Sequence, residues 1–313
     1  GSGESGKSTV LKQMKIIHGG GFTPEELRQY KQIVRQNLID SAQQLLRVML
    51  QWGYRPNLGE LPPDPVHALL DFQLLPGKNV PPWIVEAVIL LWTAQPFMNE
   101  ILMRSNEFYL MDNAPYFFKH ALRICDKAYW PTNRDVLRSR LQTRGITKSL
   151  FAADRMLIHM YDVGGQRAER KKWIYAFENV KCVIFTAALS EYDQALLENP
   201  GQNRMLESMK LFENIIASRW FQNSVFMLFF NKVDVYEDKY ARSPLNKYFP
   251  EYSGTDAAAG LKYIAYRYLR LNRAGVQMYY HITTATDTKK MRVITAAVRE
   301  DIMASAIKDS GLI

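Results

Sequence analysis

Cysteine is scarce in this sequence, and long hydrophobic runs are missing. The two cysteines, Cys125 and Cys182, lie far apart and fit no metal-ligand spacing, so we interpret both as buried thiols in a reducing compartment. No apolar run reaches about 18 residues, so no membrane-spanning helix is predicted. Charges of one sign never form a block of about five or six. The net charge of +9 therefore indicates an ordinary solvated surface, and no nucleic-acid partner is expected.

The remaining composition is that of a globular protein with real cores. Hydrophobic residues make up 47% of the 313 residues and aromatic residues 12%, which excludes a disordered chain. A chain of this length is expected to form about two domains.

A phosphate-binding loop occupies the first eight residues, Gly1-Ser2-Gly3-Glu4-Ser5-Gly6-Lys7-Ser8. Its glycines allow backbone N–H groups to surround phosphates, Lys7 can reach the β and γ oxygens, and the Ser8 hydroxyl suits Mg²⁺. A helix over residues 7–18 is predicted to follow, with its N-terminus facing the phosphates. Such a loop normally follows a strand, and no strand precedes Gly1, so we interpret the sequence as N-terminally truncated.

Two regions with different predicted secondary structure follow the loop. Residues 22–130 are predicted to form an all-helical unit. Its first helix is capped by Thr23-Pro24-Glu25-Glu26 and extends to about residue 52, and further helices are expected at 66–72, 82–93, 96–104 and 114–128. From about residue 156, apolar strands at 156–161, 182–185, 225–230 and 279–282 alternate with helices at 204–218, 260–271 and 289–308. This alternation predicts a doubly wound α/β fold with a parallel sheet and a ligand at the C-terminal ends of its strands.

The polar residues after those strands indicate guanine as the base. Asn231-Lys232-Val233-Asp234 follows the strand at 225–230. A carboxylate at Asp234 can accept hydrogen bonds from the N1–H and N2–H₂ groups of guanine, which adenine does not present, and Lys232 can lie along the base. By itself this string is also consistent with a turn.

Two further segments lie at strand ends. Asp162-Val163-Gly164-Gly165-Gln166 can place a carboxylate near Mg²⁺ and backbone near a γ-phosphate, although a glycine turn explains its glycines equally well. Ala285, within Thr283-Thr284-Ala285-Thr286, is a candidate to donate its backbone N–H to the base.

Together with residues 135–143 and 162–173, these motifs resemble the α subunits of heterotrimeric G proteins, with a fungal-like sequence. The resemblance spans essentially the whole chain. It implies a P-loop NTPase fold: a Ras-like GTPase domain of residues 1–20 and 134–313 that lacks its first strand, with an all-α domain of residues 22–130 inserted as a lid over the nucleotide.

The resemblance also implies the site residues. Arg140 would stabilise charge on the transferred phosphoryl group and Gln166 would orient the attacking water. Mg²⁺ would bind Ser8 and Thr143, with Asp162 reaching it through water. The other implied contacts to GTP or GDP are Glu4, Ser5, Gly6, Lys7, Thr9, Asp112, Asn113, Leu137, Arg138, Ser139, Leu141, Gln142, Val163, Gly164, Gly165, Asn231, Lys232, Val233, Asp234 and Ala285.

The implied function is a molecular switch that hydrolyses GTP and passes signals from G-protein-coupled receptors to effectors. Its implied partners are the Gβγ dimer, a receptor, an effector and GTPase-activating regulators, and its implied place is the cytoplasmic face of the plasma membrane, as a peripheral protein. Two alternatives stay open at this point. One is a guanine-nucleotide-binding module with negligible turnover, and the other is an ATP-dependent P-loop enzyme.

Several finer expectations follow from the same resemblance. Arg170 is expected to contact the segment near Glu207, Glu4 to pair with Arg140, and Trp173 to belong to a partner surface. Gln142 and Arg144 depart from the residues common beside the magnesium threonine, and the segment 198–202 lacks the usual acidic run. Ser310 replaces the cysteine that pertussis toxin ADP-ribosylates in one subclass, so resistance to that toxin is expected.

Overall fold

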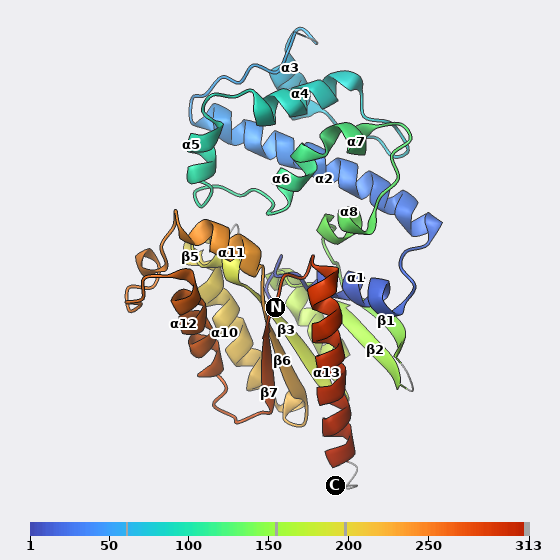
Figure 1. Cartoon of the computed structure of the whole chain (residues 1–313), viewed down its shortest axis with the longest axis vertical. Helices are drawn as coiled ribbons and strands as arrows, with labels where there is room; N and C mark the ends of the chain where they lie inside the picture. The colour runs from blue at the N-terminus through green and yellow to red at the C-terminus, as the bar shows by residue number, and fades with distance from the viewer. Residues whose placement is uncertain (61, 154–155, 197–198, 310–313) are drawn as a thin grey trace. The chain divides into compact units, whose positions relative to one another are not determined.

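The computed structural model describes residues 1–60, 62–153, 156–196 and 199–309 (Figure 1). Backbone contacts divide the chain into two compact units. The helical unit comprises Phe22–Leu141, and the α/β unit comprises Gly1–Gly21 with Gln142–Ile313. The sequence placed the return to the α/β unit at residue 134, whereas the structure groups residues 134–141 with the helices, because α8 (Asn133–Arg138) contacts α2 (Pro24–Gln51).

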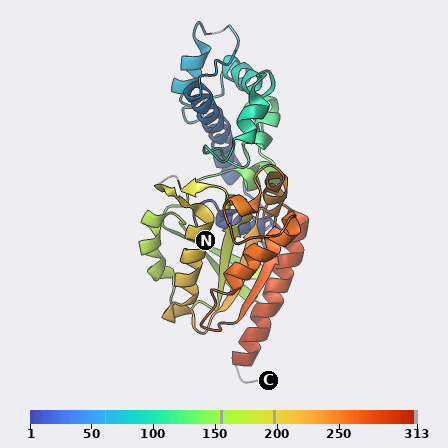
Figure 2. The same ribbon diagram turned by 90° about the vertical axis from the view of Figure 1, so that its left-hand side faces the viewer.

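The helical unit is built around α2. Its start is the predicted capping box: Glu26 N–H donates to Thr23 Oγ1 at 3.3 Å, and Thr23 N–H donates to Glu26 Oε2 at 2.9 Å. Apolar residues at helical spacing along α2, among them Leu38, Leu45 and Met49, are fully buried in the core of this unit. The helices around it are α3 (Pro65–Asp71), α4 (Pro82–Thr93), α5 (Met98–Met103), α6 (Ala114–Lys119), α7 (Ala121–Cys125) and α8. Figure 2 shows α2 beside α4, which it contacts.

The helix predicted over residues 114–128 is two short helices. His120 has φ −109° and ψ 16°, outside helical values, and it separates α6 from α7. Cys125 is buried as expected, whereas Cys182 in the α/β unit is only partly buried. Burial raises the pKa of the Cys125 thiol to about 11.

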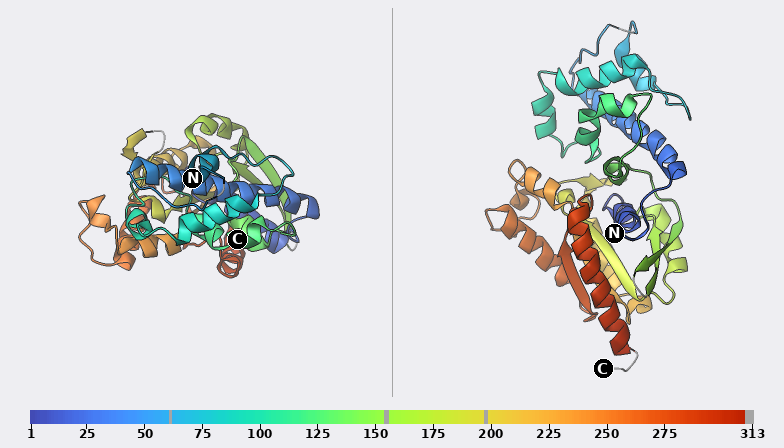
Figure 3. Two further views of the ribbon diagram at one scale, coloured as in Figure 1. Left: turned by 90° about the horizontal axis from the view of Figure 1, so that it is seen from above. Right: turned by 45° about the vertical axis from the view of Figure 1, so that its right-hand side comes forward.

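The α/β unit contains a three-stranded parallel sheet in the order β3 (Cys182–Ala188), β6 (Val225–Asn231) and β7 (Met278–Ile282). Every residue of β6 is buried, because its side chains alternate between two cores. Phe226, Leu228 and Phe230 pack in one core with α10 (Arg204–Ile216) and α12 (Ala257–Leu269). Val225, Met227 and Phe229 pack in the other with α1 (Lys7–His18) and α13 (Thr288–Asp309). Figures 2 and 3 show helices along both sides of this sheet.

The strand predicted at 156–161 does not belong to the parallel sheet. It is β2 (Met156–Val163), and it pairs antiparallel with β1 (Ile146–Ala153), a strand that the sequence did not predict. The prediction failed because β2 is not covered on both faces: Leu157 is 59% and Tyr161 44% exposed, while Met160 faces the core. The exposed face of this antiparallel strand also carries apolar residues. Its sequence therefore looks like that of a parallel strand that is buried on both faces.

Short elements complete the α/β unit. They are α9 (Arg167–Arg170), η1 (Lys171–Ala176), η2 (Leu189–Glu191), β4 (Ala195–Leu196), β5 (Asn199–Asn203), η3 (Arg219–Phe221), α11 (Val233–Tyr240) and η4 (Leu245–Lys247). Among the helices that the structure describes, none combines the length and hydropathy that crossing a bilayer requires.

A buried carboxylate organises the end of the helical unit. Asp135 is fully buried and accepts hydrogen bonds from Arg123 (2.7 and 2.9 Å), Tyr116 (2.7 Å) and Thr132 (2.9 Å). Burial alone would raise the pKa of Asp135, but the hydrogen bonds from Arg123, Thr132 and Tyr116 outweigh it and hold that pKa well below its usual range. Asp135 therefore joins α6, α7 and α8.

We expect Asp135→Ala to lower the free energy of unfolding of the helical unit by about 2–3 kcal/mol, because several buried hydrogen bonds lose their acceptor. Since the folded-state pKa is depressed, this stabilisation is present above about pH 4 and is lost as the pH falls further. Urea unfolding followed by circular dichroism measures the change. Asp71→Ala, at an exposed position in the same unit, is the control and should alter stability by less than about 0.5 kcal/mol. Equal losses in both variants would contradict this role.

Candidate functional site

The phosphate-binding loop adopts a backbone suited to anions. Glu4 and Gly6 have φ values of 66° and 105°, both in the left-handed region. Helix α1 begins directly after them at Lys7, and Gly6 supplies no side chain to cap it. Successive N–H groups in such a turn, followed by a helix N-terminus, form a favourable site for phosphate. A Cβ at Gly6 would lie 2.1 Å from Asn231 Nδ2, so only glycine fits there.

The ammonium group of Lys7 is held over the loop. Its Nζ donates to the carbonyl oxygens of Gly1 at 3.0 Å and Ser2 at 2.6 Å. Burial lowers the pKa of Lys7 to about 8, although Asp162 and Glu191 act in the opposite direction. A lysine with this pKa is stabilised in its charged form when an anion binds beside it.

Three oxygen-bearing side chains meet at the start of α1. Ser8 Oγ donates to Asp162 Oδ2 at 2.6 Å and lies 2.8 Å from Thr143 Oγ1. Thr143 Oγ1 also lies 3.4 Å from Asp162 Oδ2. These are the side chains that the sequence associated with Mg²⁺, and they come from α1, the segment before β1, and β2. Hydroxyl and carboxylate oxygens are hard donors that fit Mg²⁺. No cluster of three or more His, Cys, Asp or Glu side chains occurs among the described residues, so this set depends on its two hydroxyls.

The glycine segment after β2 approaches the loop closely. A Cβ at Gly165 would lie 2.3 Å from Lys7 Nζ and 2.5 Å from Ser2 O. The neighbouring Gln166 accepts a hydrogen bond at its Oε1 from Gln142 Nε2, at 2.6 Å. The segment that carries Gln166 is therefore in contact both with the phosphate loop and with the segment that carries Thr143.

Arginines after Gln166 fix this segment against α10. Arg170 Nη1 donates to Glu207 Oε1 at 2.8 Å, as the sequence predicted. Arg167 also binds Glu207, at 3.1 and 2.9 Å, and reaches Gln202 at 2.8 Å. Burial raises the pKa of Glu207, but hydrogen bonds from Arg167 and Arg170 outweigh it, so the net shift is downward. The role of Arg167 was missed, although its i, i+3 spacing from Arg170 places both on one side of a helical turn.

The prediction that Trp173 belongs to a partner surface is wrong. Trp173 is 5% exposed, packs in the core with Phe185, and donates from Nε1 to Gly164 O at 2.7 Å. The neighbouring Ile174 and Tyr175 are exposed instead, at 52% and 82%. A 3₁₀ turn here directs the tryptophan inward and its two successors outward.

The buried side chain of Asn231, at the end of β6, is hydrogen-bonded to the phosphate-binding loop and to the segment after β7. Its Nδ2 donates to Ser5 O at 2.9 Å, and its Oδ1 accepts from Ala285 N–H at 2.9 Å and from Thr283 Oγ1 at 3.1 Å. The N–H of Ala285, predicted to face the base, is thus given to Asn231 in this structure. The next residue, Lys232, has φ 61° and directly precedes α11, and Asp234 lies in the first turn of that helix, with its Oδ1 3.4 Å from Thr284 Oγ1.

Two residues that hydrogen-bond to the phosphate-binding loop were not predicted from the sequence. Thr186, in the C-terminal half of β3, shares a hydrogen bond of 2.6 Å between its Oγ1 and Ser5 Oγ. Arg204 donates to Gly3 O at 3.1 Å and to Glu191 Oε1 at 2.6 Å, and lies 3.6 Å from Glu4 Oε2. The position of Thr186 directly after the predicted strand at 182–185 was the available signal. The suggested pairing of Glu4 with Arg140 joins the two units and stays a prediction.

Two asparagines hydrogen-bond to the backbone of residues 138–140 in the helical unit. Arg140 N–H donates to Asn37 Oδ1 at 2.6 Å, and Asn37 Nδ2 donates to Arg140 O at 2.9 Å. The Arg140 guanidinium donates to the Tyr109 hydroxyl. Asn113, predicted to contact nucleotide, donates to Arg138 O at 3.0 Å and so fixes the same segment.

The remaining predicted residues of the two units have these positions. Leu137 is buried, and Ser139 Oγ donates to Val136 O at 2.8 Å. Leu141 is 68% exposed, and Thr9 and Asp112 are partly exposed. Val163 is packed on the core around Trp173. Glu198 and Ser310 lie outside the described residues.

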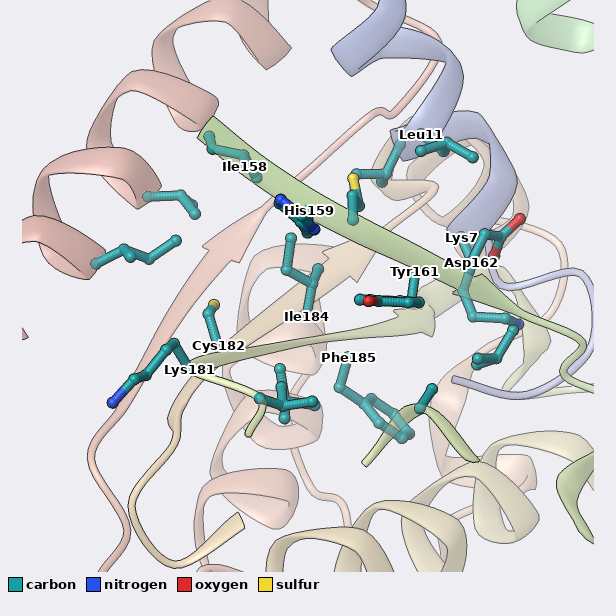
Figure 4. A pocket seen from close by; sticks show the side chains of 18 of the residues that line it. Lys7, Leu11, Ile158, His159, Tyr161, Asp162, Lys181, Cys182, Ile184 and Phe185 are labelled. Carbon is teal, nitrogen blue, oxygen red and sulfur yellow. The ribbon is translucent and has the colours of Figure 1, made fainter. Parts of the chain in front are cut away.

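An apolar cavity of about 620 Å³ lies beside the site, between α1, β2 and β3 (Figure 4). Lys7 and Asp162 stand at one end of it, and Ile158, Ile184 and Phe185 are among the side chains that line it. β2 is hydrogen-bonded to β1 and β3 to β6, so this cavity separates the two sheets.

Comparison with known proteins shows the family to which the chain belongs. The family model described as G-protein alpha subunit matches residues 1–302. The guanine nucleotide-binding protein alpha-3 subunits of Neurospora crassa and Mycosarcoma maydis are 47% and 48% identical over this entire chain, which covers 88% and 89% of those proteins. The alpha-2 subunit of Saccharomyces cerevisiae is 41% identical over all of this chain and 71% of its own length. The chain belongs to the G-protein α-subunit family, and it is a GTP-binding switch of signal transduction.

We expect Asn231→Ala to destabilise the α/β unit by about 2–4 kcal/mol, because it removes the partner of three buried polar groups. Nucleotide affinity should fall with it, since Ser5 loses its support. Thermal unfolding and fluorescent-nucleotide titration measure the two effects. Asn223→Ala, at an exposed position before β6, should leave both unchanged. An Asn231→Ala protein as stable as Asn223→Ala would refute the bracing role.

The pKa of Lys7 predicts a pH dependence of nucleotide binding. Bound phosphate favours the charged lysine, so affinity should be constant below about pH 7.5 and should fall towards tenfold per pH unit above pH 8. Titration of the protein with GDP between pH 6.5 and 9 tests this. Lys7→Met should bind GDP more weakly. Its affinity should lack the fall above pH 8 that the lysine causes, while any effect of ionisation of the nucleotide itself remains in both proteins. Parallel curves for the two proteins would contradict the assignment.

Proposed function

We propose that this chain hydrolyses its bound GTP to GDP and phosphate, and that it does so with Mg²⁺. The observation that supports this is the meeting of Ser8, Thr143 and Asp162 beside Lys7 and the glycine segment that carries Gln166. In GTPases, metal and lysine neutralise the phosphates while a glutamine orients water.

The roles of individual side chains follow from their chemistry. Ser8 and Thr143 would hold Mg²⁺ directly and Asp162 through water, and the ion would supply charge to the phosphate oxygens. Lys7 would bind the β and γ oxygens, and Gln166 would orient the attacking water. We assign Arg140 to the charge that develops on the phosphoryl group. α subunits as a class supply this arginine within their own chain and turn over at about 10⁻² per second.

The base would be recognised at the C-terminal end of β6. Asp234 is placed in the first turn of α11, and the left-handed conformation of Lys232 sets the entry to that helix. A carboxylate here distinguishes guanine from adenine through the N1–H and N2–H₂ groups.

Family membership supports the proposed partners. These are a Gβγ dimer, a G-protein-coupled receptor, an effector and GTPase-activating regulators, with the protein attached peripherally at the cytoplasmic face of the plasma membrane. The cycle of GTP binding and hydrolysis would alter the segments around Thr143 and Gly165, which are the parts of the α/β unit that a γ-phosphate would hold.

Single-turnover hydrolysis of prebound GTP, started with Mg²⁺, tests the activity. We expect a rate on the order of 10⁻² per second for the wild type, and a loss on the order of 10²-fold or more for Gln166→Leu and Arg140→Ala. Gln222→Leu and Arg134→Ala alter the same residue types at exposed positions and should retain the wild-type rate. A wild-type protein that binds GTP but hydrolyses it no faster than an EDTA-treated sample would refute the proposal.

A further inference from the structure

Gln142 contacts the residue to which we assign the water-orienting role. Its Nε2 donates to Gln166 Oε1 at 2.6 Å, within the α/β unit. Gln142 is itself exposed and stands directly before Thr143, whereas Gln166 is partly buried at the start of α9. The oxygen that would accept a hydrogen bond from the attacking water is therefore engaged by an exposed neighbour.

The backbone around Gln166 is fixed independently of Gln142. Trp173 Nε1 holds Gly164 O at 2.7 Å, and Arg167 and Arg170 anchor the following turn to Glu207. The Cγ of Gln166 lies 3.5 Å from the position of a Cβ at Gly3, so the base of the side chain already lies against the phosphate loop. The hydrogen bond with Gln142 therefore sets the direction of the terminal amide of Gln166.

We propose that Gln142 is a positioning residue that withholds the Gln166 amide from the attacking water and thereby slows GTP hydrolysis. This inference rests on the proposed function. A contact that is made in the ground state and given up in the transition state raises the barrier. The contact is a neutral hydrogen bond at an exposed position, so its effect on the rate is about threefold.

Two substitutions remove the donor of this hydrogen bond while keeping a side chain of similar size. Gln142→Met keeps the length and removes the donor, and Gln142→Glu keeps the shape and removes the donor. In single-turnover hydrolysis of prebound GTP, we expect both variants to be about threefold faster than wild type. Rates that are unchanged or lower in the Met and Glu variants would overturn the proposal.

Two readouts distinguish positioning from a general structural effect. Affinity for Mg²⁺, GDP and aluminium fluoride, which imitates the transition state, should rise by the same factor in Gln142→Met, while affinity for the unreactive analogue GTPγS should not change. In the GDP-bound protein, the side-chain amide NMR signal of Gln142 should shift in Gln166→Leu, since its acceptor is lost. An unshifted signal would show that the contact does not form.

The same experiments separate this proposal from the proposed function. If wild type and Gln166→Leu hydrolyse GTP at equal rates, the assigned role of Gln166 fails, whatever the Gln142 variants do. If Gln166→Leu loses activity but Gln142→Met is no faster than wild type, the function stands and the role of Gln142 fails.

Discussion

The candidate site depends on one buried amide. Asn231 ends the strand that is covered on both faces, and its side chain supports the phosphate loop at Ser5 and the segment after β7 at Ala285 and Thr283. A primary amide can do this because it donates and accepts at the same time, and because burial makes an unmet hydrogen bond expensive. The loop proposed to bind the phosphates and the segment proposed to contact the base are therefore both bound to one residue at the centre of the sheet.

A second chain of contacts leads away from the loop to an exposed surface. Gly165 is packed against Lys7 and Ser2, and the preceding carbonyl, that of Gly164, is bound by buried Trp173. Ile174 and Tyr175 follow Trp173 directly and are exposed. Because close-packed interiors transmit displacements, a shift of the glycines at the loop would move the tryptophan and with it these exposed apolar side chains.

The sequence predicted those parts that local patterns determine. The capping box at Thr23, the helix over 7–18 and the all-buried strand before Asn231 are all present, because cap chemistry and apolar periodicity act over a few residues. The contacts it missed join residues that are distant in the chain, such as Asn231 to Ser5, 226 residues apart, and Arg204 to Gly3, 201 residues apart. The burial of Trp173 and the antiparallel pairing of β2 with β1 likewise depend on tertiary packing, which a local sequence pattern does not predict.

The division of the chain has a consequence for how it folds. The helical unit is one uninterrupted stretch, Phe22–Leu141, so all of its internal contacts can form while the rest of the chain is still being synthesised. Helix α1 is made earlier, yet its core partners on β6 and α13 come more than two hundred residues later. Helix α1 is thus among the last elements of the α/β unit to be fully buried, although it precedes the helical unit in the chain.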